Sequence, residues 1–252
     1  MPDDLVPEHR DAAHLAQLAG KALLELRSGP SGSRDLGAAG DRAAHQLLVA
    51  ELNTMYPDDP VRSEEGLEHI SSAGRLWIVD PLDGTREFRE LGRSDWAVHV
   101  ALSVGGAPVV GAVALPAREM VLSTGEPPVL PPHPEGEPPR VVVSRTRPPD
   151  VAYEVTEALG GVMIPMGSAG AKIAAVILGE ADVYVHAGGQ YEWDSCAPAA
   201  VALASGLHAS RLDGQPLRYG EPDAWLPDLI VCRQEYAQAV LDVTTAQSRP
   251  YW

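Results

Sequence analysis

Positive charge is scarce in this sequence. Its 252 residues include 19 lysine and arginine residues against 35 aspartate and glutamate residues, a net charge of −16, and Lys21 and Lys172 are the only lysines. A chain with this balance has no basic face for the phosphate backbone of nucleic acid or for an anionic membrane surface, so we expect neither among its partners. A phosphorylated molecule can bind here only where a metal ion or a local cation reverses the field.

Cysteine and long apolar runs are also scarce. Cys196 falls inside a predicted helix and Cys232 closes an apolar strand, which favours two buried thiols over a disulfide and is typical of a reducing cytoplasm. No apolar run approaches the roughly 20 residues that span a bilayer. We therefore expect a soluble, cytoplasmic protein. Its 252 residues can bury a substantial core, so we expect one large domain or two small ones.

Prolines, by contrast, are concentrated between residues 126 and 139, where they exclude a central strand or a helix. We place a boundary there and predict an N-terminal α+β domain over residues 1–130 and a C-terminal α/β domain over residues 131–252. The apolar patterns predict two helices packed on an antiparallel sheet in the first domain, with helices over 11–27 and 41–55 and strands over 61–63, 75–79, 96–104, 107–115 and 119–124. Strands and helices alternate in the second domain, with strands over 140–144, 162–165, 181–185 and 228–232 and helices over 149–159, 169–178, 194–205 and 235–244.

The most informative stretch is Asp80-Pro81-Leu82-Asp83-Gly84-Thr85, which directly follows the apolar run 76–79. Its proline and glycine force a sharp turn at the carboxyl end of the predicted strand, so Asp80 and Asp83 are held a few ångströms apart. Like charges this close oppose each other's ionisation unless a cation lies between them, and a hard divalent ion such as Mg²⁺ prefers oxygen ligands. The alternative is an ordinary turn at a strand end, where Asp, Pro and Gly are common.

Acidic residues elsewhere complete this pattern. Glu64 and Glu65 follow the predicted strand 61–63, and Trp193-Asp194 opens a predicted helix. Taken alone, paired glutamates indicate a solvated surface and Asp194 indicates a helix cap. In this order, however, Glu-Glu, Asp-Pro-Leu-Asp-Gly-Thr and Trp-Asp resemble the inositol monophosphatase superfamily of metal-dependent, lithium-sensitive phosphatases, and the resemblance covers nearly the whole chain.

The resemblance implies a layered αβαβα fold and a carboxylate site for two or three Mg²⁺ ions. Its expected ligands are oxygen atoms, namely the side chains of Glu64, Asp80, Asp83 and Asp194 and the backbone carbonyl of Leu82. Hydrolysis of a phosphate ester needs such a cluster, because one metal ion lowers the pKa of a bound water and another shields the leaving oxygen. No Cys/His spacing in the sequence is typical of zinc. His99, on a strand of alternating polarity, is predicted as a core or inter-layer residue rather than a ligand.

Asp41 has two interpretations. It starts the predicted helix 41–55, where an acidic residue caps the first turn and complements the helix dipole. The resemblance implies instead that Asp41 and Thr85 orient and activate the attacking water, and that Glu64 is catalytic with them. The Thr-x-Ala-Asp pattern usual in the family reads Ala38-Ala39-Gly40-Asp41 here, so this match is weaker. The residues alone leave both interpretations open, and the resemblance favours the catalytic one.

Within the superfamily, Gly84–Phe88 and Gly188–Asp194 are most similar to the 3'-phosphoadenosine 5'-phosphate phosphatases of the CysQ type, and Leu207–Gly214 is similar to their actinobacterial members. Met166–Lys172 leads into a predicted helix whose exposed N–H groups form an anion site, unless this Gly-Ser start is only a cap. The residues that the resemblance places at the substrate are Gly84, Thr85, Arg86, Gly167, Ser168, Lys172 and Asp194.

The expected function is Mg²⁺-dependent hydrolysis of 3'-phosphoadenosine 5'-phosphate to AMP and phosphate, in sulfate assimilation, with 3'-phosphoadenosine 5'-phosphosulfate as a further substrate. The same metal site is compatible with inositol-1-phosphatase or fructose-1,6-bisphosphatase activity. A catalytically weak interaction protein is the alternative from another class, and the intact carboxylates argue against it. The resemblance also implies a homodimer.

Overall fold

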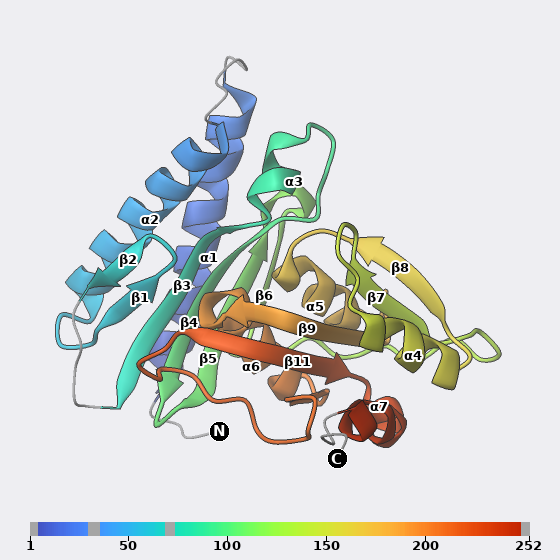
Figure 1. Cartoon of the computed structure of the whole chain (residues 1–252). Coiled ribbons are helices and arrows are strands. Elements are labelled where there is room, and N and C mark those ends of the chain that lie inside the picture. The colour runs from blue at the N-terminus through green and yellow to red at the C-terminus, as the bar shows by residue number, and fades with distance from the viewer. Residues whose placement is uncertain (1–4, 30–35, 69–73, 248–252) are drawn as a thin grey trace.

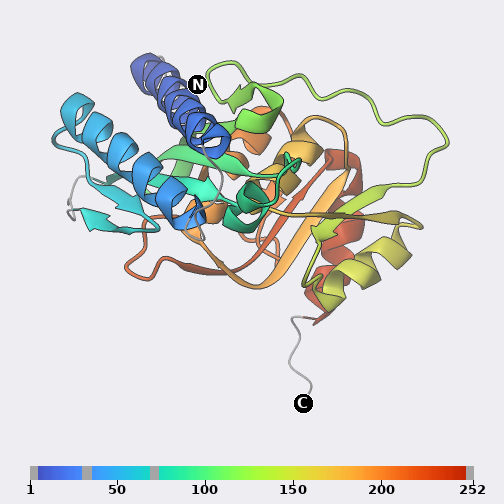
Figure 2. The same cartoon turned by 90° about the horizontal axis from the view of Figure 1, so that it is seen from above.

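Two neighbouring helices form the first layer of the fold. The structure is a computed structural model that describes residues 5–29, 36–68 and 74–247. Helices α1 (Val6–Ser28) and α2 (Leu36–Met55) lie side by side on one face of a six-stranded sheet (Figures 1 and 2). Because their buried residues recur at helical spacing, each helix turns one apolar face toward the sheet.

The first sheet is antiparallel except at one pairing. Its strands are β1 (Val61–Ser63), β2 (Gly66–Glu68), β3 (Arg75–Asp83), β4 (Ala97–Val104), β5 (Ala107–Leu115) and β6 (Met120–Ser123), in the order β2-β1-β3-β4-β5-β6. Only the pairing of β1 with β3 is parallel, so the predicted antiparallel sheet is in fact mixed. Side chains alternate along β4: Val98 and Val100 pack with α1 and α2, whereas Ala97 and Ala101 face the second half of the chain.

The second sheet joins parallel and antiparallel strands. It consists of β7 (Arg140–Ser144), β8 (Val162–Met166), β9 (Val183–Tyr191), β10 (His208–Ser210) and β11 (Trp225–Cys232), in the order β10-β11-β9-β7-β8. Strand β7 runs parallel to β8 and β9, and β11 runs antiparallel to β9 and β10. The parallel part follows from the predicted alternation of strands and helices, since a helix returns the chain between parallel strands.

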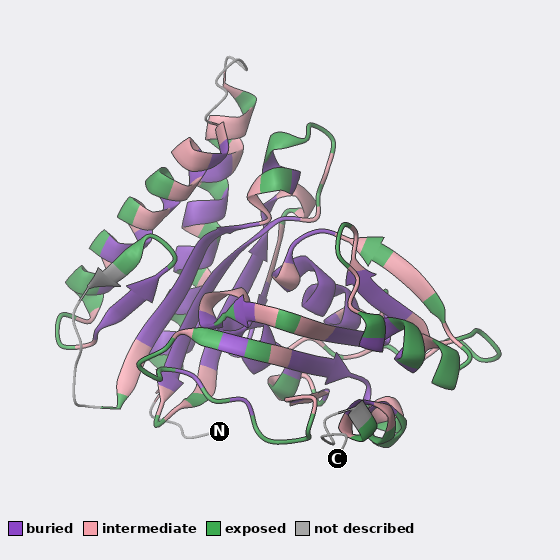
Figure 3. Cartoon of the chain, viewed as in Figure 1, coloured by how far each residue is buried: buried purple, intermediate pink, exposed green. Residues whose placement is uncertain are grey.

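The remaining long helices complete the layers. Helices α5 (Ala169–Ile177) and α6 (Cys196–Ala204) lie between the two sheets, while α4 (Asp150–Ala158) and α7 (Gln234–Gln247) cover the outer face of the second sheet (Figure 1). Most residues of α5 and α6 are buried, because a sheet lies on either side of them (Figure 3). The order helix, sheet, helix, sheet, helix confirms the predicted αβαβα fold. No helix within the described ranges is long and apolar enough to cross a membrane.

The two halves of the chain share a buried core. Helices α5 and α6 come from the second half and pack on β4 and β5 of the first. Gly111 on β5 permits this approach, because a Cβ there would overlap the carbonyl oxygen of Ala197 on α6. The proline-rich connection 126–139 is mostly exposed and links β6 to β7. The division of the chain into 1–130 and 131–252 stays a prediction.

Several elements are longer than predicted. Helix α2 begins at Leu36 rather than at Asp41, and β3 continues to Asp83. Strand β9 continues to Tyr191 and β11 already begins at Trp225, and these two residues pair with each other. The extended parts of β3, β9 and β11 pair with other strands rather than with neighbouring residues, so the local pattern did not contain them. The short elements β2, β10 and α3 (Thr85–Arg89) lie outside the predicted set.

Candidate active site

The predicted metal loop, residues 80–85, is a sharp irregularity near the end of β3. Pairing with β4 is regular up to Asp80, opposite His99, and resumes only at Asp83. The N–H of Leu82 donates to Oδ1 of Asp80 (3.0 Å), which fixes the intervening turn. Gly84 follows with φ of 88°, a left-handed conformation that favours glycine. The sequence therefore dictates locally that two buried carboxylates leave this strand end together.

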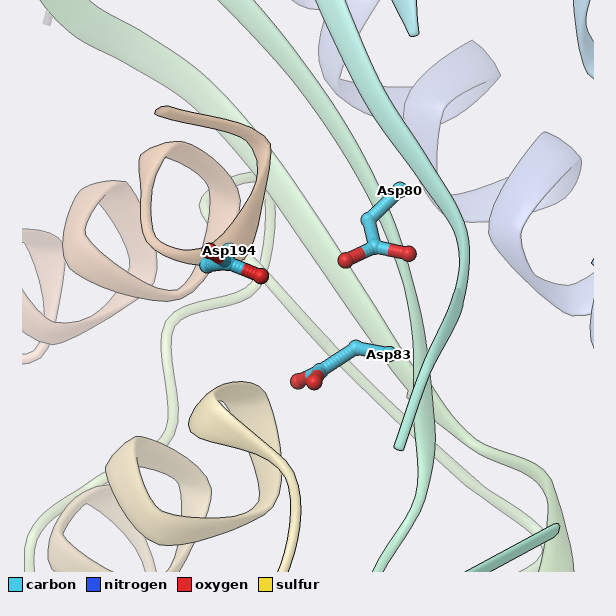
Figure 4. A group of neighbouring side chains, drawn as sticks. All are labelled: Asp80, Asp83 and Asp194. Atoms are coloured by element: carbon cyan, nitrogen blue, oxygen red, sulfur yellow. The ribbon is translucent and has the colours of Figure 1, made fainter. Parts of the chain in front are cut away.

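A third carboxylate reaches this point from the second half of the chain. Asp194 ends a short 3₁₀ helix, η3 (Glu192–Asp194), that follows β9, and its Oδ2 accepts the N–H of Tyr191 (2.7 Å). Oxygen atoms of Asp80, Asp83 and Asp194 lie within 4.8 Å of one another. Figure 4 shows the three carboxylates pointing into one common space. Asp194 therefore does not cap α6, whose helix begins only at Cys196.

The electrostatics of this cluster favour a bound cation. Burial, and then repulsion from Asp83 and Asp194, raises the pKa of Asp80 well above its usual value. Burial and the charge of Asp83 raise the pKa of Asp194 to about 7. Two basic groups lie nearby, and burial lowers the pKa of both His99 and Lys172. Oxygen donors that resist being ionised together fit a hard divalent cation, which would remove their mutual repulsion.

Glu64 lies at the rim of the carboxylate cluster. It follows β1, its side chain is exposed, and it is not one of the three residues whose oxygen atoms converge. Its charge nevertheless contributes to the raised pKa values of Asp80 and Asp194. Partial desolvation and the charges of Asp41 and Asp83 in turn raise the pKa of Glu64 to about 7. The structure thus brings three of the four predicted carboxylate ligands together and leaves Glu64 beside them.

Asp41 and Thr85 meet next to this cluster. The hydroxyl of Thr85 donates to Oδ1 of Asp41 (3.5 Å) and to the carbonyl oxygen of Leu82 (3.2 Å). Burial and the charge of Glu65 raise the pKa of Asp41 to about 6. Because α2 already begins at Leu36, Asp41 lies beyond its first turn, and the interpretation of Asp41 as a helix cap is wrong. A carboxylate that titrates near neutral pH is suited to accept a proton.

Two glycines allow α2 to approach the metal loop closely. A Cβ at Gly37 would lie 2.5 Å from Cγ2 of Thr85, and a Cβ at Gly40 would lie 3.1 Å from Cδ2 of Leu82. Packing therefore explains Gly40, the residue that weakens the family pattern before Asp41. Because Gly40 has no side chain, the helix, and with it the Asp41 carboxylate, can lie against the loop.

The first turn of α5 already binds an anion, and that anion is Asp83. Its carboxylate accepts the Ser168 hydroxyl (2.6 Å), the Gly170 N–H (2.5 Å) and the Ala169 N–H (3.2 Å). The N–H of Gly167 is paired as well, with the Asp95 carboxylate (2.7 Å). Our expectation of exposed N–H groups at this helix start is therefore wrong, although the same residues do form an anion site.

Lys172 and Arg86, both predicted to bind substrate, lie in different environments. Lys172 is buried and its ammonium donates to the carbonyl oxygens of Ser168 (2.7 Å) and Gly167 (3.4 Å), while it lies 5.3 Å from the centre of the Tyr184 ring. It still borders the cleft described below. Arg86 is exposed on α3 and is not among the residues that line that cleft.

His99 connects the two halves of the site. It is fully buried, as predicted for a core or inter-layer residue. Its Nδ1–H donates to the carbonyl oxygen of Trp193 (2.9 Å), next to Asp194 in the chain, and its Nε2 lies 3.4 Å from Oδ2 of Asp83. The sequence pattern placed His99 on the inner face of β4, but it contained no signal for this contact with the segment around Asp194.

A cleft of about 840 Å³ opens beside Asp83 and Asp194. Tyr191 and Trp225 line it from β9 and β11, and each residue is 46% exposed. Their ring centroids are 5.4 Å apart in an edge-to-face arrangement. A Cβ at Gly189 would overlap the Trp225 indole, so glycine leaves room for this ring. Sequence reasoning missed both aromatic rings as functional candidates, and the Gly188-Gly189 pair ahead of Tyr191 was their only signal.

Comparison with known proteins agrees with this geometry. The sequence profile of the inositol monophosphatase family matches residues 11–129 and 133–249. The chain therefore belongs to this family of metal-dependent enzymes, as the order of its acidic motifs predicted.

Its relatives include enzymes with a narrower description. The 3'-phosphoadenosine 5'-phosphate phosphatase of Mycobacterium leprae is 47% identical in an alignment of 256 positions, gaps included, that covers 92% of this chain and 91% of the relative. The enzyme of the same name from Mycobacterium tuberculosis is 50% identical over 234 residues, 88% of each chain. The crystal structure of CysQ from Bacteroides thetaiotaomicron matches with a TM-score of 0.77 and 27% sequence identity. The match covers 90% of this chain and 97% of the CysQ chain.

Proposed function

We propose that this protein is a Mg²⁺-dependent phosphatase that removes the 3'-phosphate of 3'-phosphoadenosine 5'-phosphate and releases AMP and phosphate. The observation that carries the proposal is a single cleft in which a carboxylate cluster adjoins two exposed aromatic rings, Tyr191 and Trp225. The carboxylates suit the phosphate end of a substrate, and the rings suit a flat base. The names of the mycobacterial relatives agree with this choice.

The metal ligands in this proposal are oxygen atoms from both halves of the chain. They are the side chains of Asp80, Asp83, Asp194 and Glu64 and the backbone carbonyl of Leu82, around two or three Mg²⁺ ions. When bound, Mg²⁺ lowers the pKa of a coordinated water and shields charge on the leaving oxygen. Neutralised carboxylates also allow a polyanionic substrate to approach a chain of net charge −16.

The remaining chemistry belongs to Asp41 and Thr85. Asp41, with a pKa of about 6, takes the proton of the attacking water, which the Thr85 hydroxyl orients. The water oxygen forms a bond to phosphorus while the bond between phosphorus and the ribose 3'-oxygen breaks. The released 3'-oxygen takes a proton from solvent and becomes the 3'-hydroxyl of AMP. The backbone N–H groups of Gly84 and Thr85 are the proposed donors to the phosphate oxygens.

The aromatic rings favour a nucleotide over a sugar phosphate. Stacking of a base on an aromatic side chain contributes about 1 to 3 kcal/mol, and inositol phosphates offer no such face. Ser168 and Lys172 border the cleft on the side of α5, and we place the second phosphate of the substrate near them. Arg86, which does not line the cleft, has no role in this proposal.

A phosphate-release assay with competing substrates tests the proposal. We expect kcat/KM to be highest for 3'-phosphoadenosine 5'-phosphate, followed by 3'-phosphoadenosine 5'-phosphosulfate, and to be far lower for inositol 1-phosphate and fructose 1,6-bisphosphate. A preference for inositol 1-phosphate would contradict it. We also propose a cytoplasmic homodimer, for which light scattering should give twice the chain mass of 26.7 kDa.

A further inference from the structure

A buried ion pair joins the two halves of the chain next to the metal site. The guanidinium of Arg62 on β1 donates through Nη1 to Oε1 of Glu192 in η3, and the two side chains are only 7% and 1% exposed. Both partners also bind the backbone of one loop. Arg62 Nη1 donates to the carbonyl oxygen of Glu221 (2.8 Å), and Oε2 of Glu192 accepts the N–H of Gly220 (2.8 Å).

Each partner lies two residues before a predicted metal ligand in the sequence. Arg62 precedes Glu64 by two residues, and Glu192 precedes Asp194 by two residues. On β1 the hydroxyl of Ser63 is hydrogen-bonded to Nδ1 of His45 on α2 (2.9 Å). Because side chains alternate along a strand, Arg62 leaves β1 on the opposite face, toward the second half of the chain. The pair thus fastens the segment that delivers Glu64 to the segment that delivers Asp194.

We propose that the Arg62–Glu192 pair is a positioning device for the metal centre, which sets how closely Glu64 and Asp194 approach before a cation binds. Mutual repulsion among the carboxylates tends to separate these segments. The ion pair resists this separation, because pulling it apart would leave an unpaired charge on each side of a buried contact. Arg62 and Glu192 touch neither metal nor substrate and act only through the segments that they hold. The proposal rests on the metal site of the proposed function.

The chain contains a matched control for this pair. Arg233, whose side chain is 3% exposed, pairs with the fully buried Asp182 (2.9 Å) and donates to the carbonyl oxygen of Pro131 (2.7 Å). It therefore binds a buried carboxylate and a backbone carbonyl, as Arg62 does, and its Nη1 also lies 3.7 Å from the exposed Glu235 carboxylate. Cys232, just before Arg233, pairs with Val183 at the start of β9, whereas Asp194 follows the other end of that strand.

The test compares Arg62→Met with Arg233→Met in the full-length protein. Metal binding is measured directly by titration with Mn²⁺, followed by electron paramagnetic resonance, alongside the melting temperature. We expect both variants to melt earlier, but only Arg62→Met to raise the Kd for Mn²⁺, by roughly tenfold, the usual lower bound for residues that support metal ligands. At saturating metal, kcat of Arg62→Met should largely recover, so that the loss lies in metal affinity.

Milder variants keep the test decisive if a methionine variant does not fold. Arg62→Lys and Arg233→Lys retain a positive charge but cannot reproduce both contacts of the guanidinium, and the same difference in Kd is expected between them. Equal Kd values in the two variants, whether raised or unchanged, would overturn the positioning role. A wild-type protein that binds no Mn²⁺ would instead reject the proposed function and this inference with it.

Discussion

The hydroxyl of Thr85 donates to the carboxylate of Asp41 across 44 residues of sequence. This contact joins the second turn of α2 to the end of the metal loop, where the Thr85 hydroxyl also reaches the Leu82 carbonyl oxygen. It places a carboxylate with a pKa of about 6 beside the predicted metal ligands without making it one of them. A proton acceptor separate from the metal ligands can be altered without removing the metal.

The substitution Asp41→Asn tests this role. Asp41 does not cap α2, so the melting temperature should change little, while loss of a positioned base should lower the single-turnover rate by roughly 10²- to 10⁴-fold. Thr85→Ala should produce a similar loss, and the double variant should be much less impaired than the product of the two. An Asp41→Asn rate equal to that of the wild type would remove Asp41 from the mechanism.

The pH dependence of kcat/KM follows from the same residue. Asp41 accepts a proton only when ionised, so activity of the wild type should fall as the pH drops through about 6. This acidic limb should be missing from the residual activity of Asp41→Asn. The measurement is a pH profile of both proteins at saturating Mg²⁺, and an identical limb in the two profiles would assign it to another group.

Removal of metal should make stability depend on pH. Asp194 and Glu64 have pKa values of about 7 in the metal-free fold, whereas ordinary carboxyl groups titrate near about 4 in an unfolded chain. Between these pH values the folded state binds more protons than the unfolded state, so its stability falls as the pH rises. With EDTA present, the melting temperature should therefore be lower at about pH 8 than at about pH 5, and added Mg²⁺ should raise it more at the higher pH. A Mg²⁺ effect independent of pH would contradict the carboxylate repulsion.

Trp225→Leu tests the aromatic wall of the cleft. Loss of base stacking should raise KM for 3'-phosphoadenosine 5'-phosphate by roughly 5- to 140-fold, which corresponds to about 1 to 3 kcal/mol, with little change in kcat. Hydrolysis of glycerol 2-phosphate, which has no base, should be unaffected. Tyr153→Leu is the control, because Tyr153 is 52% exposed on α4 and does not line the cleft. An equal effect on both substrates would show that Trp225 does not bind the base.

Gly37→Ala tests the close approach of α2. Alanine is the better helix former by about 1 kcal/mol, so propensity alone would stabilise the variant. The new methyl group would, however, lie 2.5 Å from Cγ2 of Thr85, and Thr85 must move to avoid the overlap. We therefore expect a fall of roughly tenfold in kcat, because small displacements of catalytic groups are costly. Unchanged kcat with a raised melting temperature would mean that the helix can shift without cost.

The sequence predicted best what consecutive residues determine. The turn from Asp80 to Gly84 needs only its own proline and glycine and the strand before it, and it was placed correctly. The first turn of α5 was predicted as an anion site from its Gly-Ser start, although its N–H groups are paired rather than exposed. Which anion binds there depends on Asp83, 85 residues from Ser168, and the local pattern could not contain that contact.

Contacts remote in sequence account for the other differences. Asp41 was predicted to start its helix, but α2 already includes Gly37, which packs against Thr85 and Arg89 of α3. The Arg62–Glu192 pair spans 130 residues and breaks the rule that charged side chains lie outside. The ends of β9 and β11 that carry Tyr191 and Trp225 were likewise not predicted, because they form by pairing with each other.

The hydrogen bonds between Asp83 and the first turn of α5 have a consequence for how the protein acquires its metal. A helix N-terminus carries roughly half a positive charge, and this charge is part of the backbone and cannot dissociate. Helix α5 is thus a permanent counterion inside the fold, present whether or not a metal ion is bound to the three aspartates. The chain can then reach its native structure before it meets a divalent ion. We therefore expect that metal loading can follow folding, and that one ion can replace another without the protein having to unfold.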